Sequence, residues 1–153
     1  MTAIAIDEVG ADQMEPVMAI MTAAFDPGYG EAWTEPQLVS MMTLPGTWLS
    51  LARIDGRPAG FALSRLIGDE AELLLLAVAP GHRRLGVATA LIRHTREILR
   101  LRNGFRLHLE VRQNNPAIEL YKKLGFAPVG RRPGYYRGRD GQLHDALTLS
   151  CSI

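Results

Sequence analysis

The stretch from residue 70 to residue 102 constrains the fold more than any other part of the sequence. An apolar run ends at Val78, the residues APGHRRLGVA follow, and an amphipathic run then begins. The first run is apolar enough for a central strand of a sheet. Across 86–102 the spacing is helical, and one face carries Ala88, Leu91, Ile92, Thr95, Ile98 and Leu99. The sequence therefore predicts a buried strand, a tight turn and a helix.

The turn of this unit has the features of an anion-binding site. The first N–H groups of a helix have no partner inside the helix, and the helix dipole adds about half a positive charge there. Small residues at Gly86 and Ala88 let an anion approach the backbone, and Arg83 and Arg84 strengthen the field. The alternative is a tight turn with solvated arginines. The three-glycine dinucleotide fingerprint and the Gly-Lys-Ser/Thr of nucleoside-triphosphate loops are both absent.

The remaining sequence alternates short strands with short helices. Strands are expected at 3–9, on both sides of Asp55-Gly56 within 47–66, at 105–112, at 126–130 and at 142–150. Phe105 belongs to the apolar face of its strand. Helices are expected at 12–25 with Asp12 as N-cap, at 34–42 with Thr34 and Gln37 as a capping box, and at 115–125 with Gly125 after its last turn.

This pattern predicts an α/β (α+β) fold in one domain spanning 1–153, with a mixed, mostly antiparallel sheet flanked by helices. The chain shows no internal repeat and no linker. Its 153 residues are enough for an ordinary core.

Composition and charge exclude several classes of protein. With 17 basic and 16 acidic residues, the net charge of +1 argues against a nucleic-acid binder. No apolar run approaches the roughly 20 residues of a membrane span, and the N-terminus lacks the pattern of a signal peptide. The four histidines show no ligand spacing, so no metal is expected. Cys151 is the only cysteine, so it implies no disulfide and is expected to be buried. We expect a soluble cytoplasmic protein, and its oligomeric state stays open.

Two motifs resemble those of the GNAT superfamily of N-acetyltransferases. The residues from Arg83 to Ala88 resemble the acyl-CoA pyrophosphate loop of that superfamily, Gln/Arg-x-x-Gly-x-Gly/Ala. The segment after residue 108 resembles its Asn-x-x-Ala-x-x-Leu-Tyr-x-x-x-Gly-Phe motif, with Asn114, Ala117, Leu120, Tyr121, Gly125 and Phe126 in place. The resemblance implies the GNAT fold, with acetyl-CoA as co-substrate.

Within the superfamily, the segments LEVR, LYKKLGF, RRPGYY, HDALTL and AWTEPQL most resemble the RimI-type protein N-terminal acetyltransferases. That group is associated with acetylation of the N-terminal alanine of a ribosomal protein of the small subunit. One departure is that Glu110 and Asn114 are one residue closer together than is usual in the group.

The resemblance to the RimI group also implies roles for individual residues. Glu110 would be the general base and Tyr121 the general acid. Glu110 lies on the polar face of its strand, and a phenol with a pKa near ~10 can protonate a thiolate with a pKa near ~8.5. The alternative for Tyr121 is a core aromatic at helical spacing. The implied cofactor contacts are Leu76, Ala77 and Val78 for the pantetheine arm, Arg84, Leu85, Gly86, Val87, Ala88 and Thr89 for the pyrophosphate, and Asn114 for the arm. Val78 N–H would also face the thioester oxygen, and Asn114 has a helix N-cap as its alternative role.

The acceptor is the least determined part of this interpretation. A lone carboxylate suits an α-amine, because at pH 7 roughly one α-amine in ten is neutral, against fewer than one lysine in a thousand. A small-molecule amine or a lysine side chain is the second hypothesis, and a CoA-binding sensor without turnover is the third. The basic segment 131–139 is expected to be a loop, either a solvated hairpin or a lid over the acceptor in which Tyr135 and Tyr136 pack on a peptide N-terminus.

Overall fold

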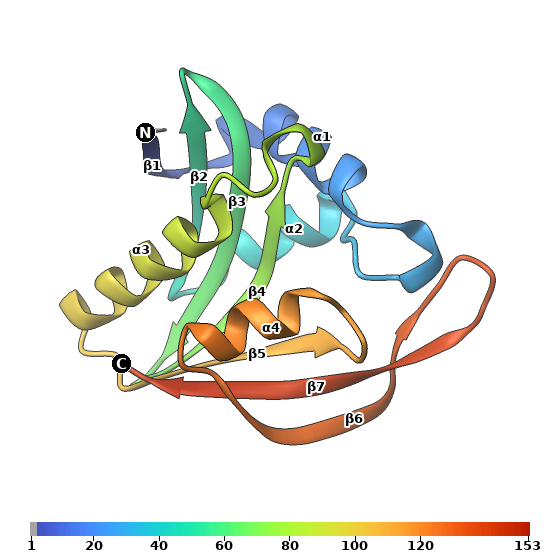
Figure 1. The fold of residues 1–153 in the computed structure, drawn as a ribbon. Coiled ribbons are helices and arrows are strands. Elements are labelled where there is room, and N and C mark those ends of the chain that lie inside the picture. The colour runs from blue at the N-terminus through green and yellow to red at the C-terminus, as the bar shows by residue number, and fades with distance from the viewer. Residues whose placement is uncertain (1–2) are drawn as a thin grey trace.

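The computed structural model describes residues 3–153 and has three layers, with one sheet between two pairs of helices (Figure 1). Helices α1 and α2 pack on one face of the sheet, and α3 and α4 pack on the other. The strands are β1 Ile4–Val9, β2 Thr47–Ile54, β3 Arg57–Ile67, β4 Glu70–Val78, β5 Arg106–Arg112, β6 Ala127–Arg137 and β7 Leu143–Ser152. The helices are α1 Met14–Ala24, α2 Glu35–Met42, α3 Val87–Leu101 and α4 Ala117–Lys123. Short 3₁₀ turns cover Ala11–Gln13, Pro27–Tyr29 and Pro80–His82.

The order of strands in the sheet is β1-β2-β3-β4-β5-β7-β6. All neighbours are antiparallel except β4 and β5, which are parallel and are joined through α3. A parallel pair needs such a crossover connection, and α3 supplies it. The expected fold class, a mostly antiparallel sheet flanked by helices, is confirmed.

Several local predictions are also confirmed. Thr34 Oγ1 accepts from the N–H of Gln37, and the Gln37 side chain accepts from the N–H of Thr34, which is the expected capping box. Asp55 and Gly56 have φ values of 51° and 77°, so the β2–β3 turn has the left-handed backbone that favours Asp-Gly. Gly125 has a φ of 96° just after α4, as expected for its position.

Three local predictions are wrong. Asp12 does not cap α1, because residues 11–13 form a separate 3₁₀ turn and the cap position falls on Gln13. Phe105 is 57% exposed, because β5 begins only at Arg106. The basic segment 131–139 is not one loop: β6 continues through Arg137, because β7 pairs with it as far as that residue.

A bulge in β4 determines where the sheet opens. Leu63 of β3 pairs with Leu75, whereas the next residue, Ser64, pairs with Leu73, so Leu74 is the extra residue. In a regular strand, residues two apart share a face. Here Leu73 belongs to the core beneath α3 and α4, and Leu75 to the core beneath α1 and α2. The bulge therefore rotates β4 and bends it, as bulges do.

Beyond this bulge, β4 and β5 separate. Their pairing covers only Glu70 to Leu73 on β4 and Arg106 to Leu109 on β5. The later part of β4 keeps its hydrogen bonds to β3 on one side, and its other edge faces the opening. Among the helices within residues 3–153, none combines the length and the apolar character needed to cross a membrane.

Candidate active site

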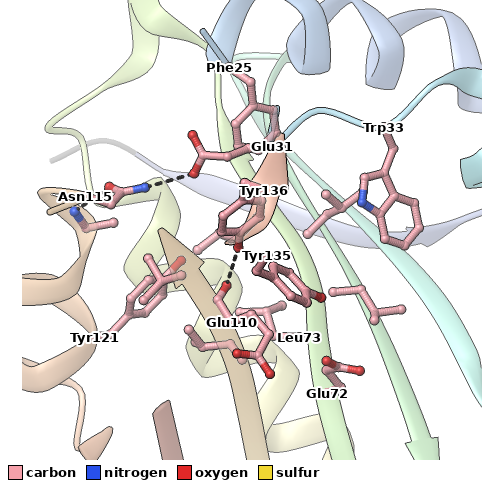
Figure 2. A pocket seen from close by; sticks show the side chains of 16 residues that line it. Phe25, Glu31, Trp33, Glu72, Leu73, Glu110, Asn115, Tyr121, Tyr135 and Tyr136 are labelled. Carbon is pink, nitrogen blue, oxygen red and sulfur yellow. Dashed lines mark hydrogen bonds between the residues drawn. The ribbon is translucent and has the colours of Figure 1, made fainter. Parts of the chain in front are cut away.

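A cavity lies where β4 and β5 separate, and it brings both expected catalytic residues together (Figure 2). Glu110 reaches it from β5, and Tyr121 reaches it from α4. Its wall includes residues from five parts of the chain, namely Phe25, Glu31, Trp33, Glu72, Leu73, Leu74, Leu75, Leu76, Leu109, Val111, Asn115, Ala117, Tyr135 and Tyr136. This lining mixes apolar side chains with three glutamates, one asparagine and three tyrosines, so the cavity offers both apolar contact and polar partners to a ligand.

The Glu110 carboxylate is almost fully enclosed, with its side chain 6% exposed. Its Oε2 accepts a hydrogen bond of 2.6 Å from the Thr148 hydroxyl on β7, and its Oε1 lies 3.1 Å from Arg132 Nε on β6. The backbone oxygen of the same residue accepts from the Tyr136 hydroxyl at 3.2 Å. The first two contacts hold the carboxylate at the edge of the cavity, and the third ties the backbone of Glu110 to β6.

Tyr121 is buried on α4, with its ring edge-on to Phe126 at 5.7 Å between centroids. Burial raises the pKa of the Tyr121 phenol well above its ordinary value, and the negative charge of Glu31 raises it further. Both effects disfavour the phenolate, so Tyr121 stays protonated at neutral pH. A proton donor needs its proton in place, and the same raised pKa makes this phenol a weaker acid than a free tyrosine.

Two tyrosines of β6 cover the cavity from the side of the β6–β7 hairpin. The rings of Tyr135 and Tyr136 lie edge-to-face at 4.9 Å. Burial, as the largest cause, raises the pKa of both phenols. Both tyrosines line the cavity, but they lie on a strand and not on the expected loop, and their contact with an acceptor stays a prediction.

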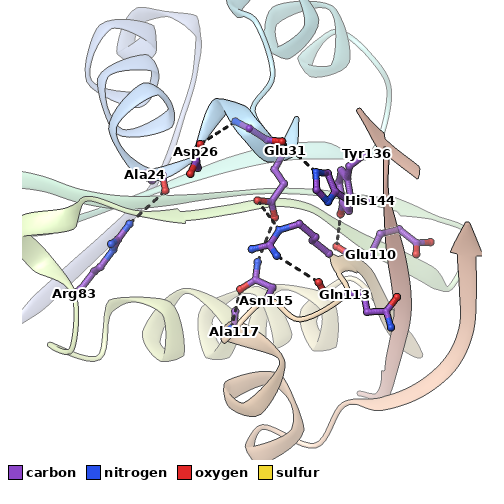
Figure 3. Close-up of polar contacts among 12 residues, drawn as sticks. Ala24, Asp26, Glu31, Arg83, Glu110, Gln113, Asn115, Ala117, Tyr136 and His144 are labelled. Carbon is purple, nitrogen blue, oxygen red and sulfur yellow. Dashed lines mark hydrogen bonds and ion pairs between the residues drawn. The ribbon is translucent and has the colours of Figure 1, made fainter. Parts of the chain in front are cut away.

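The segment between α1 and α2 forms another wall, and a buried ion pair holds it in place (Figure 3). Glu31 Oε1 lies 3.4 Å from Arg112 Nε at the end of β5, and each side chain is only 12% exposed. The Arg112 guanidinium also lies over the Tyr29 ring, 3.6 Å from its centroid. Glu31 Oε2 accepts from the Asn115 side chain at 3.3 Å. The pair therefore links this segment to β5 and to the start of α4.

The two adjacent asparagines have different structural positions. Asn114 is exposed and has a φ of 70°, at the third position of a turn closed by the hydrogen bond from Asn115 N–H to Arg112 O. Asparagine tolerates this left-handed conformation better than most residues. Asn115 lines the cavity, and its Oδ1 accepts from the N–H of Ala117 at 2.9 Å. Asn114 therefore does not cap α4: the N-cap position falls on Pro116 without a side-chain cap, and the side-chain bond at the start of the helix comes from Asn115.

The expected pyrophosphate loop forms a second cavity at the start of α3. Its walls are Val78, His82, Arg83, Arg84, Gly86, Val87, Ala88, Thr89 and Leu120. Arg84 and Gly86 have φ values of 64° and 84°, so the backbone curls tightly before the helix. No side chain caps α3, and its first turn carries no acidic residue, so the positive field there is not neutralised.

The residues present at this second cavity fit a phosphate group. His82 Nδ1 is buried and has no hydrogen-bond partner among the described residues. A Cβ added to Gly86 would meet nothing within 4 Å, so the space beside the loop is open. An unpartnered imidazole nitrogen, two arginines and the uncapped N–H groups of a helix are partners that an anion can use.

The β4 edge lies between the two cavities. Leu76, Ala77 and Val78 pair with Ala62, Phe61 and Gly60 of β3. At Gly60 an added Cβ would lie 2.8 Å from the Ala77 oxygen, so glycine permits this close strand pairing beside α3. Leu76 lines the first cavity and Val78 the second. An extended chain bound along this edge would connect them.

Sequence reasoning missed several residues of the cavity. Phe25, Glu31 and Trp33 fall in or beside the segment DPGYGEAW, which looked like an ordinary loop. The two glycines of this segment are the sequence signal for a tightly packed turn. At Gly30 the φ is 69°, and a Cβ there would lie 1.9 Å from the Arg137 oxygen, so the segment packs closely on β6. Glu72 lies in a strand whose sequence is mostly apolar, so no pattern marked it as a cavity residue. Within residues 3–153, no three His, Cys, Asp or Glu side chains gather as they would around a metal ion.

Comparisons with known proteins agree with this geometry. Residues 14–126 match the family model described as the acetyltransferase (GNAT) family. Over 100 residues, 65% of this chain and 67% of the relative, the chain is 39% identical to the [ribosomal protein bS18]-alanine N-acetyltransferase of Escherichia coli (strain K12). Over 99 residues, 63% of this chain and 52% of the relative, it is 37% identical to the streptothricin acetyltransferase of Streptomyces lavendulae. The crystal structure of the ribosomal-protein-S18-alanine N-acetyltransferase from Escherichia coli is similar with a TM-score of 0.86 at 29% identity, over 99% of this chain and 94% of that one.

Proposed function

Because this chain belongs to the acetyltransferase (GNAT) family, we propose that it acetylates the N-terminal α-amine of a protein, with the N-terminal alanine of a ribosomal protein as the favoured acceptor. The observation that carries this proposal is the 39% identity to the Escherichia coli enzyme named for that acceptor. The cavity supports it, because its aromatic side chains and its glutamates, Glu110 among them, suit an acceptor that carries an ammonium group.

The residues at the two cavities would hold acetyl-CoA, which supplies the acetyl thioester. Arg84, Leu85, Gly86, Val87, Ala88 and Thr89 would bind the pyrophosphate with backbone N–H groups and positive charge. Leu76, Ala77 and Val78 would pair with the amides of the pantetheine arm along the free β4 edge. The Val78 N–H would stabilise the negative charge that develops on the carbonyl oxygen. Asn114 would contact the arm from the exposed side of the β5–α4 turn.

The protons of the reaction have a source and a destination in the first cavity. Glu110 would accept a proton from the acceptor's ammonium group, directly or through water, and so free the lone pair that attacks the carbonyl carbon. The C–N bond forms as the C–S bond breaks. Tyr121, which stays protonated, would donate its proton to the departing thiolate, and the second proton that the nitrogen loses as the amide forms would restore the phenol.

The composition of the cavity favours direct transfer in a ternary complex. Among the described residues that line it there is no cysteine, serine, threonine, histidine or lysine, so a thiol, an aliphatic hydroxyl, an imidazole or an amine that could take the acetyl group first is absent from this lining. Cys151 is buried on β7, opposite Leu107 of β5. The acceptor amine itself would therefore attack the thioester.

A second candidate function is acetylation of a small-molecule amine. The observation that favours it is the 37% identity to streptothricin acetyltransferase, which is named for a small molecule. The fold and the cofactor residues would be the same, and only the occupant of the aromatic cavity would differ.

A panel of acceptors separates the two functions by mass spectrometry. The panel contains alanine-initiated peptides with free and with blocked N-termini, the same peptides with and without lysine, free amino acids, polyamines and streptothricin. Acetylation confined to free N-termini, strongest for alanine, supports the proposal. Acetylation of lysine or of a small amine moves the function to the second candidate, and a wholly unmodified panel with tight acetyl-CoA binding indicates a sensor.

A further inference from the structure

Glu110 already has a cationic partner, Arg132, at the position where an acceptor amine would bind. Arg132 Nε lies 3.1 Å from Glu110 Oε1, and the Thr148 hydroxyl occupies Oε2 at 2.6 Å. The Glu110 side chain is 6% exposed, whereas the Arg132 side chain is 61% exposed. The guanidinium therefore covers the carboxylate on its solvent side.

Arg132 pairs with Ala146 of β7 and is the last paired residue of β6 before a gap in the strand pairing. The pairing of β6 with β7 is interrupted between Arg132 and Tyr136, and Gly134 within that gap has a φ of 63°. The neighbouring Arg131 is tied to Asp145, which also accepts from the Gly134 N–H. Arg132 has instead the Glu110 carboxylate and the face of the Tyr135 ring, 5.7 Å from its centroid.

An amine acceptor reaches Glu110 as a second cation. Most α-amines are protonated at neutral pH, so the ammonium group and the Arg132 guanidinium compete for one carboxylate and repel each other. Thr148 donates a hydrogen bond whichever cation is bound, so it takes no part in this competition.

We infer that Arg132 is a resident counter-ion of Glu110 that the acceptor's ammonium group must displace. In the free enzyme Arg132 pairs with Glu110, and on acceptor binding its side chain swings toward solvent while the ammonium takes its place. Arg132 thereby lowers the affinity for the acceptor and acts as a specificity-determining residue at the entrance to Glu110. The inference rests on the proposed function, because it requires that the acceptor amine reaches Glu110.

The test measures the acceptor KM and kcat of Arg132→Gln and Arg132→Lys at saturating acetyl-CoA. An alanine-initiated peptide is used, or whichever amine the panel identifies. An exposed cation paired with a carboxylate contributes modestly, so Arg132→Gln is expected to lower the acceptor KM about three- to fivefold, with kcat nearly unchanged. Arg132→Lys keeps the charge and is expected to keep a KM close to that of the wild type. The matched control is Arg137→Gln, which removes the same charge from an exposed position on the same strand.

Binding measurements separate this inference from the function on which it rests. Calorimetry of the peptide with the CoA-saturated enzyme is expected to give the same three- to fivefold gain for Arg132→Gln, and no gain when Glu110→Gln is also present. An acceptor KM that is unchanged or raised by Arg132→Gln, while Glu110→Gln abolishes turnover, overturns this inference alone. Full turnover by Glu110→Gln overturns the role of Glu110 in the proposed function.

Discussion

The substitution Arg112→Met tests whether the ion pair beside the cavity holds the α1–α2 segment in place. Arg112 contacts Glu31 at 3.4 Å and the Tyr29 ring at 3.6 Å, and the two charged side chains are each 12% exposed. Methionine keeps much of the length and apolar volume of the arginine stem but removes the charge. Glu31 is then left as a buried carboxylate with Asn115 as its remaining hydrogen-bond partner.

The structure allows the size of the effect to be estimated. Removing one partner of a fully buried ion pair costs about 3–5 kcal/mol, because an unpaired charge is left inside. The 3.4 Å separation is longer than a good charge-assisted hydrogen bond, and Asn115 stays bound, so the lower end of the range, about 3 kcal/mol, applies. For a chain of this size, each kcal/mol lowers Tm by about 2–4 °C, so we expect a decrease of about 6–12 °C.

The assay is urea unfolding and thermal melting of the wild type and three variants. The double variant Arg112→Met/Glu31→Gln removes both charges and is expected within about 1 kcal/mol of the wild type, because a buried pair contributes little net stability. The matched control is Arg100→Met, which breaks the pair with Glu97, whose side chains are 49% and 66% exposed. It is expected to cost at most about 0.5 kcal/mol.

Two results would refute this reasoning. A loss below about 1 kcal/mol for Arg112→Met means that Glu31 is hydrated once its partner is gone. A double variant no more stable than the single variant means that the loss comes from packing on Tyr29 and not from an unpaired charge.

Three further predictions concern the site. Tyr121→Phe is expected to lower kcat by about 10²–10⁴-fold in steady-state kinetics while the acetyl-CoA Kd stays within twofold; equal losses in both would contradict the role as acid. The pKa values of Tyr121 and Tyr136 are raised by burial, so above about pH 10 the unfolded chain loses phenol protons that the folded chain keeps. Unfolding free energy should therefore fall as pH rises beyond about 10, less so in Tyr121→Phe, and a flat profile there would contradict the burial. Asn114→Gly keeps the turn but removes the amide, so acetyl-CoA Kd measured by calorimetry should rise with no loss of Tm; an unchanged Kd would limit Asn114 to the turn.

The features that sequence analysis predicted correctly are those encoded by neighbouring residues. The capping box of Thr34 and Gln37 and the Asp55-Gly56 turn are local hydrogen-bonding and backbone preferences. The course of β6 depends instead on β7, because Pro133 and Gly134 interrupt any local strand pattern and Asp145 on β7 fixes the chain there. The sequence of that segment alone therefore suggested a loop.

The two halves of the candidate site differ in the same way: one is encoded by neighbouring residues, and the other is assembled from distant segments. The proposed cofactor half is a strand, a turn and a helix start within residues 76–89, so an anion site there could be proposed from one short stretch. The acceptor half joins Trp33, Glu72, Glu110 and Tyr136 from segments far apart in the chain, and no local pattern marks their meeting.

The two relatives named for a ribosomal protein and for streptothricin are almost equally identical to this chain, at 39% and 37%. Identity at that level therefore does not decide between the two proposed acceptors, and we propose that side chains around Glu110 do. Arg132 already pairs with the Glu110 carboxylate, so it is the first of these side chains to test.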